Sequence, residues 1–275
     1  MVGVGYTSPG NQTDPDQTMI PVLTHARKIQ LLALVNHVIA IAGIWYAIST
    51  SDYYLLLTAA VATVFITIVS VNIALHRFIS HNSFKTGYWR SKFLIYISII
   101  SAFGSPVSWA AMHRYHHAKS GSVDDNQSPK NIGYLRAWFT LYSSVTIPTT
   151  MIRDVIKNSD YMLIHRHYFK LLAGYLVILY LINPVLPVFL FCLPAALCYQ
   201  AAGAFAVIPH TSRFGYKVLP SLRDDDAVNS PLASVLSLGE GWHNYHHSRP
   251  GDHRQGHGKW ELDPPAWVIE KFFKI

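Results

Sequence analysis

The chain has 275 residues, of which 51% are hydrophobic and only 13% are charged. A soluble domain carries about 25% charged residues, so this composition argues against an ordinary soluble globule and against a disordered chain. The formal net charge of +7 could attract nucleic acid, but in so apolar a chain we expect it to reflect orientation in a membrane or an anionic partner, and no nucleic acid.

Four apolar segments predict that the chain crosses a membrane as two helical hairpins. The spans are expected at about 29–48, 53–75, 169–183 and 185–207. The first two contain 20 and 23 residues, and each can cross a hydrocarbon core of about 30 Å at a rise of about 1.5 Å per residue. The remaining ranges are a flexible cytosolic tail over 1–28 and a helical cap over 76–168 and 208–275.

The lysines and arginines give the predicted orientation of these spans. Two of them lie in the tail up to Lys28, twelve between His76 and Lys170, and eight between Ile208 and Ile275, which accounts for all 22. The two hairpin turns contain none. Because cytoplasmic loops of membrane proteins are enriched in Lys and Arg, both termini and the cap are predicted to face the cytoplasm.

A further apolar stretch, Phe93 to Ala111, competes with this topology. It is long enough to cross a membrane, but Ser98, Gly104 and Pro106 interrupt it. If it crossed alone, the histidines before and after it would lie on opposite sides of the membrane. We therefore expect an interfacial or protein-packed segment.

Three short motifs hold eight of the 15 histidines. They are HRFISH from His76 to His81, HRYHH from His113 to His117, and HNYHH from His243 to His247. When H-x-x-H-H lies on a helix, positions i, i+3 and i+4 project from one face. Each such face is expected to present three imidazoles to one site.

This clustering of imidazoles predicts a transition-metal centre. Neutral imidazole binds Fe, Zn, Cu or Ni, whereas the only cysteines, Cys192 and Cys198, lie in an apolar run and do not indicate a thiolate site. The absence of HExxH argues against a zinc protease. Eight imidazoles are too many for one tetrahedral zinc and enough for two metals with open positions, which favours redox iron and dioxygen.

Three strings of the sequence are similar to those of the integral-membrane fatty acyl desaturases, namely ALHRFISHNSFKT, WAAMHRYHH and LGEGWHNYHHSRPGDHR. The chain resembles this family from about Ile29 to Phe273, and within it the delta-9, stearoyl-CoA desaturase-like group and its bacterial members. The resemblance implies an all-α integral membrane protein with four transmembrane helices in two hairpins. It also implies a cytosolic helical cap with a histidine-ligated dimetal centre and, in a bacterium, a place in the inner membrane.

The resemblance further implies which histidines bind the metals. In the family a ninth ligand lies just past the fourth span, where this chain has His210 in AVIPHTSRFG. Carried over by motif, one iron is held by His76, His81, His117 and His247, and the other by His113, His116, His210, His243 and His246.

This sequence departs from the family pattern at two places. Family members commonly have Asn where this chain has Ala206, and that Asn supports a metal-bound water. Its loss is expected to affect the coordination of the first iron. It could also accompany a different reaction, such as hydroxylation or acetylenic-bond formation. Animal acyl-CoA members have Arg-Asp where Ala111 and Met112 stand here. The second departure leaves the acyl carrier open among CoA, acyl carrier protein and a glycerolipid.

The implied reaction is the oxygen-dependent introduction of a cis double bond, at delta-9, into a saturated fatty acyl chain carried as a thioester or lipid. Two iron ions and dioxygen as co-substrate are implied with it. The chain has no segment for flavin, nicotinamide or haem, so a separate ferredoxin or b-type cytochrome with its reductase is expected to supply electrons. The alternatives are a membrane hydroxylase, ketolase or acetylenase on the same centre, and a non-enzymatic metal transporter or sensor.

An acyl chain beside such a centre requires an apolar tunnel between the spans. Residues of the second span are candidates for its floor, and polar or aromatic residues near the histidines are candidates for substrate contacts. Ordinary packing is the alternative for each. These candidates are Thr63, Phe65 and Thr67 on the span, and Trp109, Arg114, Trp242 and Asn244 near the histidines.

Overall fold

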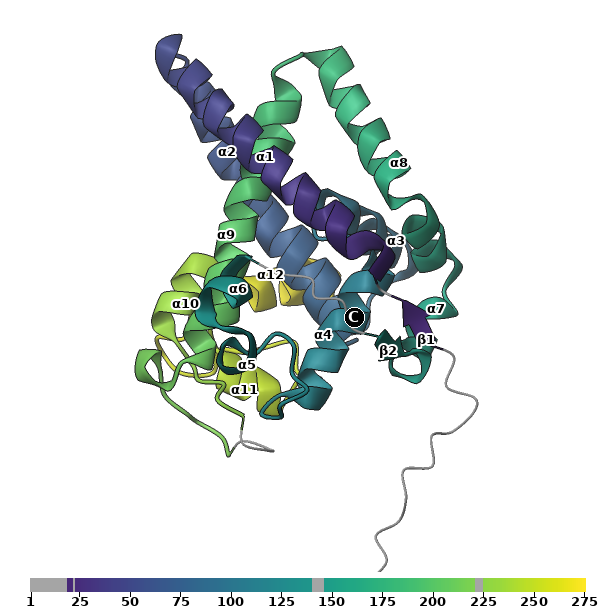
Figure 1. Cartoon of the computed structure of the whole chain (residues 1–275), viewed down its shortest axis with the longest axis vertical. Helices are drawn as coiled ribbons and strands as arrows, with labels where there is room; N and C mark the ends of the chain where they lie inside the picture. The colour runs from purple at the N-terminus through teal and green to yellow at the C-terminus, as the bar shows by residue number, and fades with distance from the viewer. Residues whose placement is uncertain (1–18, 22, 140–145, 221–224) are drawn as a thin grey trace, which may run out of the picture.

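The computed structural model describes residues 19–21, 23–139, 146–220 and 225–275. Labels follow Figure 1, and η marks 3-10 and π-helical segments. In chain order the elements are β1 (Met19–Pro21), α1 (Leu23–Ser49), α2 (Tyr53–Phe65), η1 (Ile66–Ser80), α3 (Tyr88–Ile97), η2 (Ser98–Ser101), α4 (Pro106–Lys119), α5 (Pro129–Ile132), α6 (Tyr134–Phe139), β2 (Thr146–Pro148), η3 (Thr149–Ile152), α7 (Arg153–Ile156), α8 (Ser159–Ile182), η4 (Val188–Cys192), α9 (Leu193–Val207), η5 (Ile208–His210), η6 (Ser212–Phe214), α10 (Pro231–Ser237), α11 (His243–Ser248), α12 (Pro264–Val268) and η7 (Ile269–Phe273).

Two long helical hairpins form one end of the molecule (Figure 1). In the first, α1 is followed by the continuous helix α2–η1, and in the second α8 is followed by η4–α9. Both hairpin turns lie at the end farthest from α4 and α11 (Figure 1). Because α1 packs against α9 and η4, and α2 packs against η4, the two hairpins share one bundle.

Three helical segments are long and apolar enough to cross a membrane: Ala26–Ser49, Tyr53–Ser80 and Val188–His210. They contain the predicted first and second spans and overlap the predicted fourth span over 188–207. The predicted third span lies in α8, which does not meet the same criterion among the described residues. The physical reason is that the first half of α8 carries charged side chains, including Asp160 and Arg166, and only its second half is continuously apolar.

An apolar stripe on α1 faces away from the bundle. Leu31, Leu34, Val38, Ile41 and Trp45 recur every three or four residues, and each is between 61% and 71% exposed. Residues with this spacing lie on one face of a helix. So large an apolar surface is unfavourable in water and is expected to contact lipid in a membrane protein.

The competing stretch from Phe93 to Ala111 does not form one straight span. Tyr88–Ser101 and Pro106–Lys119 are bent by 84° at the break between them. Ala102 and Gly104 adopt the left-handed conformation there, with φ of 63° and 84°, and Ser105 caps the new helix by accepting from the N–H of Ser108 at 3.2 Å. Since most of residues 98–112 are buried, the segment is packed within the protein, as the sequence suggested.

The beginning of the described chain is more ordered than predicted. The expected tail extended to residue 28, of which residues 1–18 and 22 lie outside the described part. Met19–Pro21 forms β1, which pairs antiparallel with β2 (Thr146–Pro148), and α1 already begins at Leu23. A contact between segments so far apart in sequence could not be recognised from the composition of the tail.

Candidate metal centre and adjoining pocket

Nine histidine side chains meet where η1, α4, η5 and α11 converge at the base of the bundle. The ligand nitrogens within each of two groups lie within 4.8 Å of one another. The five-histidine group is His76, His81, His113, His117 and His246, and the four-histidine group is His116, His210, His243 and His247. The groups adjoin, because the ring centroids of His117 and His247 are 4.3 Å apart. The structure thus brings together all nine histidines singled out from the sequence.

Each H-x-x-H-H motif divides its side chains between the two groups. In α4, His113 and His117 belong to the five-histidine group while His116 belongs to the other. At about 100° per residue, helical residues four apart lie about 40° from each other, whereas the residue three along lies about 60° away in the opposite direction. The i, i+4 pair therefore shares a group, and residue i+3 faces its neighbour.

The same rule applies in α11, where His243 and His247 share the four-histidine group and His246 joins the other. Neither motif therefore presents all of its histidines to one group. The division of ligands carried over by resemblance differs from this grouping, because it separates His247 from His243 and His246 from His76.

The first histidine motif depends on the π-helical geometry of η1. His76 and His81 are five residues apart, a spacing that places them about 140° apart around an α-helix. In η1 the N–H of His81 instead donates to the carbonyl of His76 at 3.2 Å, the i to i+5 pattern of a π-helix. Their rings consequently lie 5.0 Å apart. The second span was expected to end at residue 75, but its helix continues to Ser80.

Three buried carboxylates hold the outer nitrogens of the ligands. Nδ1 of His76 lies 2.6 Å from Oε2 of Glu240, at ion-pair distance. Nδ1 donates to a carboxylate at 3.0 Å for His116 and Asp125 and at 2.5 Å for His247 and Asp225. Because a carboxylate can only accept, each Nδ1 carries the hydrogen. Each Nε2 then keeps its lone pair directed at the other histidines, the arrangement common for metal-binding imidazoles.

Burial favours the neutral form of the histidines on α11. The pKa of His243 and of His246 lies well below 6.5, first because burial disfavours the charged imidazolium and then because neighbouring histidines repel it. Burial would raise the pKa of Glu240, but the charge of Arg77 and the contact with His76 lower it to about 2. Neutral imidazoles of α11 therefore lie near an anionic carboxylate.

This set of donors fits metal cations. The Nε2 atoms of facing ligands lie 2.7–3.1 Å apart. Nε2 of His247 is buried and finds no hydrogen-bond partner in the described part of the chain, although its Nδ1 already donates to Asp225. A buried lone pair without a partner is costly, and a transition metal with affinity for imidazole would satisfy it. The nine residues can therefore hold two such ions.

Ala206 lies beside the four-histidine group, where it lines an apolar pocket with His116 and His210. His113 of the five-histidine group lines the same pocket, so the expected effect of Ala206 on the first iron stays a prediction. The helix α9 leads directly into η5, which delivers His210 to the four-histidine group. Alanine offers no polar group there.

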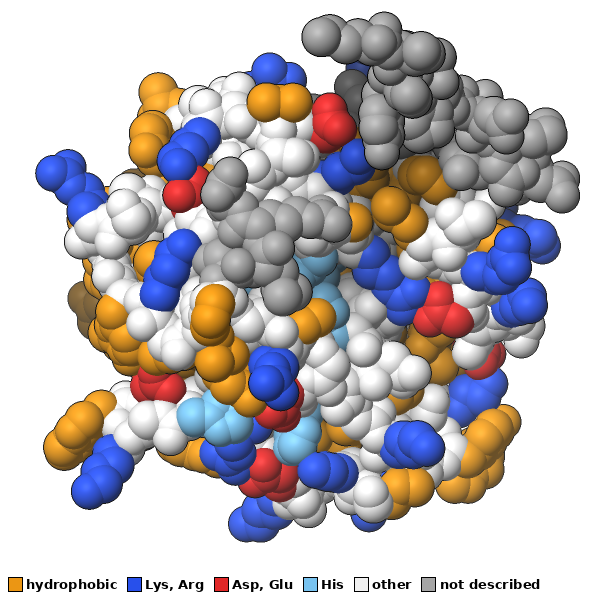
Figure 2. All heavy atoms as spheres, turned by 90° about the horizontal axis from the view of Figure 1, so that it is seen from below, with side chains coloured by type: hydrophobic (Ala, Val, Ile, Leu, Met, Phe, Trp, Pro, Cys, Tyr) orange, Lys and Arg blue, Asp and Glu red, His pale blue; other side chains and the backbone are white. Residues whose placement is uncertain are grey.

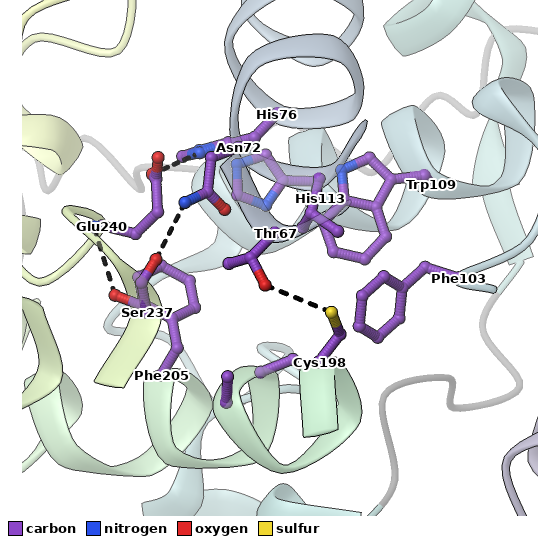
Figure 3. Close-up of a pocket in the computed structure, with 13 residues that line it drawn as sticks. Thr67, Asn72, His76, Phe103, Trp109, His113, Cys198, Phe205, Ser237 and Glu240 are labelled. Atoms are coloured by element: carbon purple, nitrogen blue, oxygen red, sulfur yellow. Dashed lines mark hydrogen bonds and ion pairs between the residues drawn. The ribbon is translucent and has the colours of Figure 1, made fainter. Parts of the chain in front are cut away.

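Two adjoining apolar pockets lie against the histidines. Trp109, His113 and Phe205 line both of them. One pocket extends inward to Cys198 on α9, as Figure 3 shows, and the other reaches Gln127 in the cap. Together they outline a path from the cap, past the two groups of histidines, into the bundle.

Of the three predicted floor residues, only Thr67 lines the inner pocket. Its Oγ1 lies 3.2 Å from Sγ of Cys198, so this pair closes the inner end (Figure 3). The hydroxyl of Thr63 donates to the carbonyl of Ala59 at 2.7 Å and does not line either pocket. Phe65 is 43% exposed and lines a groove on the outside of the bundle.

Of the four candidates near the histidines, only Trp109 lines the pockets. Its ring is nearly parallel to that of His113, with centroids 6.2 Å apart. The other three bind protein groups: Arg114 donates to Asp154 at 2.6 Å, Trp242 to the carbonyl of Leu262 at 2.8 Å, and Asn244 accepts from the N–H of Val218 at 2.8 Å. Their contacts position loops of the cap.

Several pocket residues were missed by the sequence reasoning. Phe103, Cys198 and Phe205 line the inner pocket, and Asn72 donates to the carbonyl of Ser237 at 2.8 Å beside it. The spacing of Cys198 and Phe205 on the last span, seven residues apart and thus on one helical face, was an available signal. No sequence signal identified Phe103, because the bend between η2 and α4 determines where its side chain points.

Comparisons with known proteins agree with this geometry. The family model described as fatty acid desaturase matches residues 51–261. The chain belongs to the fatty acid desaturase family. This desaturase is 26% identical over 224 residues to delta-9 acyl-lipid desaturase 2 of Arabidopsis thaliana, covering 75% of this chain and 68% of the relative.

Two further relatives align with a similar or larger share of this chain. The desaturase is 28% identical over 212 residues to the sn-1 stearoyl-lipid 9-desaturase of Anabaena variabilis, covering 75% of this chain and 76% of the relative. It is 27% identical over 269 residues to an acyl-CoA 5-desaturase of Anemone leveillei, covering 91% and 82%. The resemblance stated from the three sequence strings is confirmed, and with it an oxidoreductase that acts on fatty acyl chains.

Proposed function

We propose that this desaturase uses two iron ions and dioxygen to introduce a cis double bond, at delta-9, into a saturated fatty acyl chain. The observation that carries the proposal is the apolar pocket that passes His76 and His113 and continues between η1 and α9. Such a pocket fits an extended methylene chain rather than a polar substrate.

The metals would be held by the five-histidine and four-histidine groups. Bound iron would activate dioxygen, which is the oxidant that takes two hydrogens from an unactivated methylene pair and leaves as water. The side chains of the protein have other tasks. Glu240, Asp125 and Asp225 orient ligands, while Trp109 and Phe205 hold one part of the chain beside the centre and keep water away.

We infer that the carrier is a glycerolipid. The outer pocket reaches Gln127 in the cap, near the base of the bundle, and an acyl chain attached to a membrane lipid could enter from that side. Arg-Asp, which the animal acyl-CoA members have before the second motif, is replaced by Ala111 and Met112, both buried. Relatives named as acyl-lipid desaturases from a plant and a cyanobacterium support this choice, while a relative named as an acyl-CoA desaturase keeps the thioester as the alternative.

Electrons are proposed to come from a separate acidic carrier such as a ferredoxin or a b-type cytochrome with its reductase. Lysine and arginine side chains are spread over the cap face, around an area where histidine is visible (Figure 2). Arg153, Lys157, Arg213 and Lys217 are among the exposed basic residues of the cap. A positive surface of this kind attracts an anionic partner and accelerates its association.

The test is expression of the protein in a host of known lipid composition, with a competent reductase and carrier, followed by mass spectrometry of the acyl chains. Desaturation removes two hydrogens, whereas the hydroxylase or ketolase alternative adds oxygen and an acetylenase removes two further hydrogens from an alkene. Locating the new bond tests delta-9, and separating lipid classes tests the carrier. An unchanged profile from iron-loaded protein would contradict the proposal.

A further inference from the structure

Arg77 is a fully buried cation that lines neither of the two pockets beside the histidines. It directly follows His76 in η1 and is 1% exposed. Nε and Nη2 donate to Oε1 of Glu240 at 3.1 and 2.9 Å, and Nη1 donates to Oδ1 of Asp263 at 2.8 Å and to the carbonyl of His253 at 2.6 Å. One guanidinium therefore joins two buried carboxylates from separate segments.

The first carboxylate leads from Arg77 to His76. Oε2 of Glu240 lies 2.6 Å from Nδ1 of His76, at ion-pair distance, while its Oε1 is held by the guanidinium. A carboxylate bound at both oxygens has a fixed orientation. The imidazole of His76 is consequently fixed about its own axis, with Nε2 facing the histidines.

The second carboxylate leads from Arg77 to His246. Oδ2 of Asp263 accepts from the backbone N–H of Gln255 at 2.7 Å, and Nε2 of Gln255 lies 3.3 Å from Nδ1 of His246. Oε1 of Gln255 is buried and finds no partner in the described part of the chain. If His246 binds metal through Nε2, its Nδ1 carries a hydrogen, and the amide turned by 180° would accept that hydrogen with Oε1.

The two branches end at one place. His76 and His246 belong to the same five-histidine group, and their Nε2 atoms are 3.0 Å apart. They come from η1 and α11, whereas Gln255 and Asp263 belong to the segment that follows α11. The same segment is also fixed by Trp242, whose Nε1 donates to the carbonyl of Leu262 at 2.8 Å.

We propose that Arg77 is a positioning residue that fixes His76 and His246 relative to each other, through Glu240 on one side and through Asp263 and Gln255 on the other. The inference rests on the proposed metal centre. Without the guanidinium, two ionised carboxylates would remain buried without their cation, an arrangement that is strongly unfavourable. Both imidazoles would then lose their fixed orientation together.

The four-histidine group provides an internal comparison. Its outer nitrogens are held by Asp125 on His116 and Asp225 on His247, and neither carboxylate contacts Arg77 in the described part of the chain. A change at Arg77 should therefore weaken one metal site and leave the other intact. A purely structural role would instead lower the yield of folded protein without changing the metal content of the folded fraction.

The experiment compares Arg77→Met and Gln255→Met with the wild type, using iron content and the Mössbauer spectrum of the folded, detergent-purified fraction. We expect the iron of the five-histidine group to bind about 10- to 100-fold more weakly, so that one spectral component is lost or altered while the other persists. Arg77→Lys, which keeps the charge but not the planar fork, should partly restore the component that Arg77→Met loses.

Two controls separate this effect from general damage. Arg254→Met removes a surface pair with Glu270 in the same segment, at 2.6 Å, and should leave both components unchanged. Asp125→Asn should alter the opposite component. Folded Arg77→Met and Gln255→Met proteins with wild-type iron affinity and spectrum would overturn the proposal, and Gln255→Met decides alone if Arg77→Met fails to fold. Wild-type protein without two iron components would instead overturn the proposed metal centre itself.

Discussion

Each histidine of the centre has two ring nitrogens, Nδ1 and Nε2. The hydrogen-bond partner of Nδ1 determines whether Nε2 keeps a lone pair that can bind a metal. Where Nδ1 donates to a buried carboxylate, as in His116 and His247, Nε2 keeps a lone pair for a metal. The burial that makes this arrangement possible also opposes protonation. The chemistry of single residues is thus linked to the stability of the whole cap.

Acid should destabilise the metal-free protein through these histidines. The pKa of His243 and of His246 is lowered by burial and by neighbouring histidines, so below pH 6.5 the unfolded chain binds protons that the folded chain does not. The free energy of unfolding should therefore decrease from pH 7 to pH 5, by up to about 1.4 kcal/mol per pH unit for each such histidine. Denaturant unfolding at three pH values checks this, and a pH-independent stability in this range would contradict it.

Glu240 acts in a different pH range. Its pKa is about 2 in the folded protein, against 4.5 ordinarily, so its stabilising contribution is complete above 4.5 and is lost as the pH falls through about 2. It should not contribute to the decrease between pH 7 and pH 5. The two kinds of group are therefore separable by pH.

Cys198 should limit the length of the acyl chain. It closes the inner pocket with Thr67, so Cys198→Phe fills that end and should shift the preference to shorter chains. Each methylene that no longer fits should cost about 10- to 200-fold in specificity. Product analysis with saturated substrates of graded length checks this, with Phe65→Leu on the outer surface as the control. Unchanged chain-length preference in Cys198→Phe would rule out this position as the end of the tunnel.

At the scale of elements, the segment Gly239–Glu240–Gly241 between α10 and α11 delivers the third histidine motif. Gly239 has φ of 116°, which favours glycine. At Gly241, a Cβ would lie 2.1 Å from the backbone nitrogen of Ser234 and 2.4 Å from the carbonyl oxygen of Ser230. The close approach of α10 to the start of α11 therefore requires a residue without a side chain.

Gly241→Ala should separate α10 from α11 and destabilise the cap by about 1–3 kcal/mol or more, the cost of inserting a methyl group into a packed site. Thermal unfolding together with the iron content of the purified protein measures this. Gly251→Ala is the matched control, because a Cβ there meets no atom within 4 Å. Equal stability of the two variants would contradict the close approach.

At the scale of the whole molecule, the arrangement of the two hairpins and the cap predicts how the protein is oriented across the membrane. Both hairpin turns lie at the end opposite the histidines (Figure 1), and Lys and Arg concentrate in the cap sequence. Under the positive-inside rule we expect the metal centre to face the cytoplasm. In a bacterium the proposed location is the inner membrane.

Cysteine labelling tests that orientation. Cys192 and Cys198 are buried, so the wild type should not react with a membrane-impermeant thiol reagent. Asp52→Cys in the first hairpin turn should react from the outside of intact cells whose outer barrier is permeabilised, and Lys259→Cys in the cap only after lysis. The reverse pattern of labelling would invert the proposed topology.

Most of the architecture follows from the sequence by itself. Continuous apolar runs predict the hairpins because a membrane accepts only helices whose backbone is satisfied internally. The three histidine motifs predict the dimetal centre because imidazoles at helical spacing project together. The family, the helical fold and the clustering of all nine histidines were available before any coordinate.

Only the tertiary structure decided which side chains of these helices contact one another. The π-helical turn of η1 determines that His76 and His81 face one group, and rotation about α4 and α11 determines which histidines share a group. Arg77 contacts Asp263 across 186 positions of sequence, and Phe65 and Thr67, two residues apart, face outward and inward. Sequence patterns report which residues share a face of one helix, but contacts between helices depend on packing that no local pattern contains.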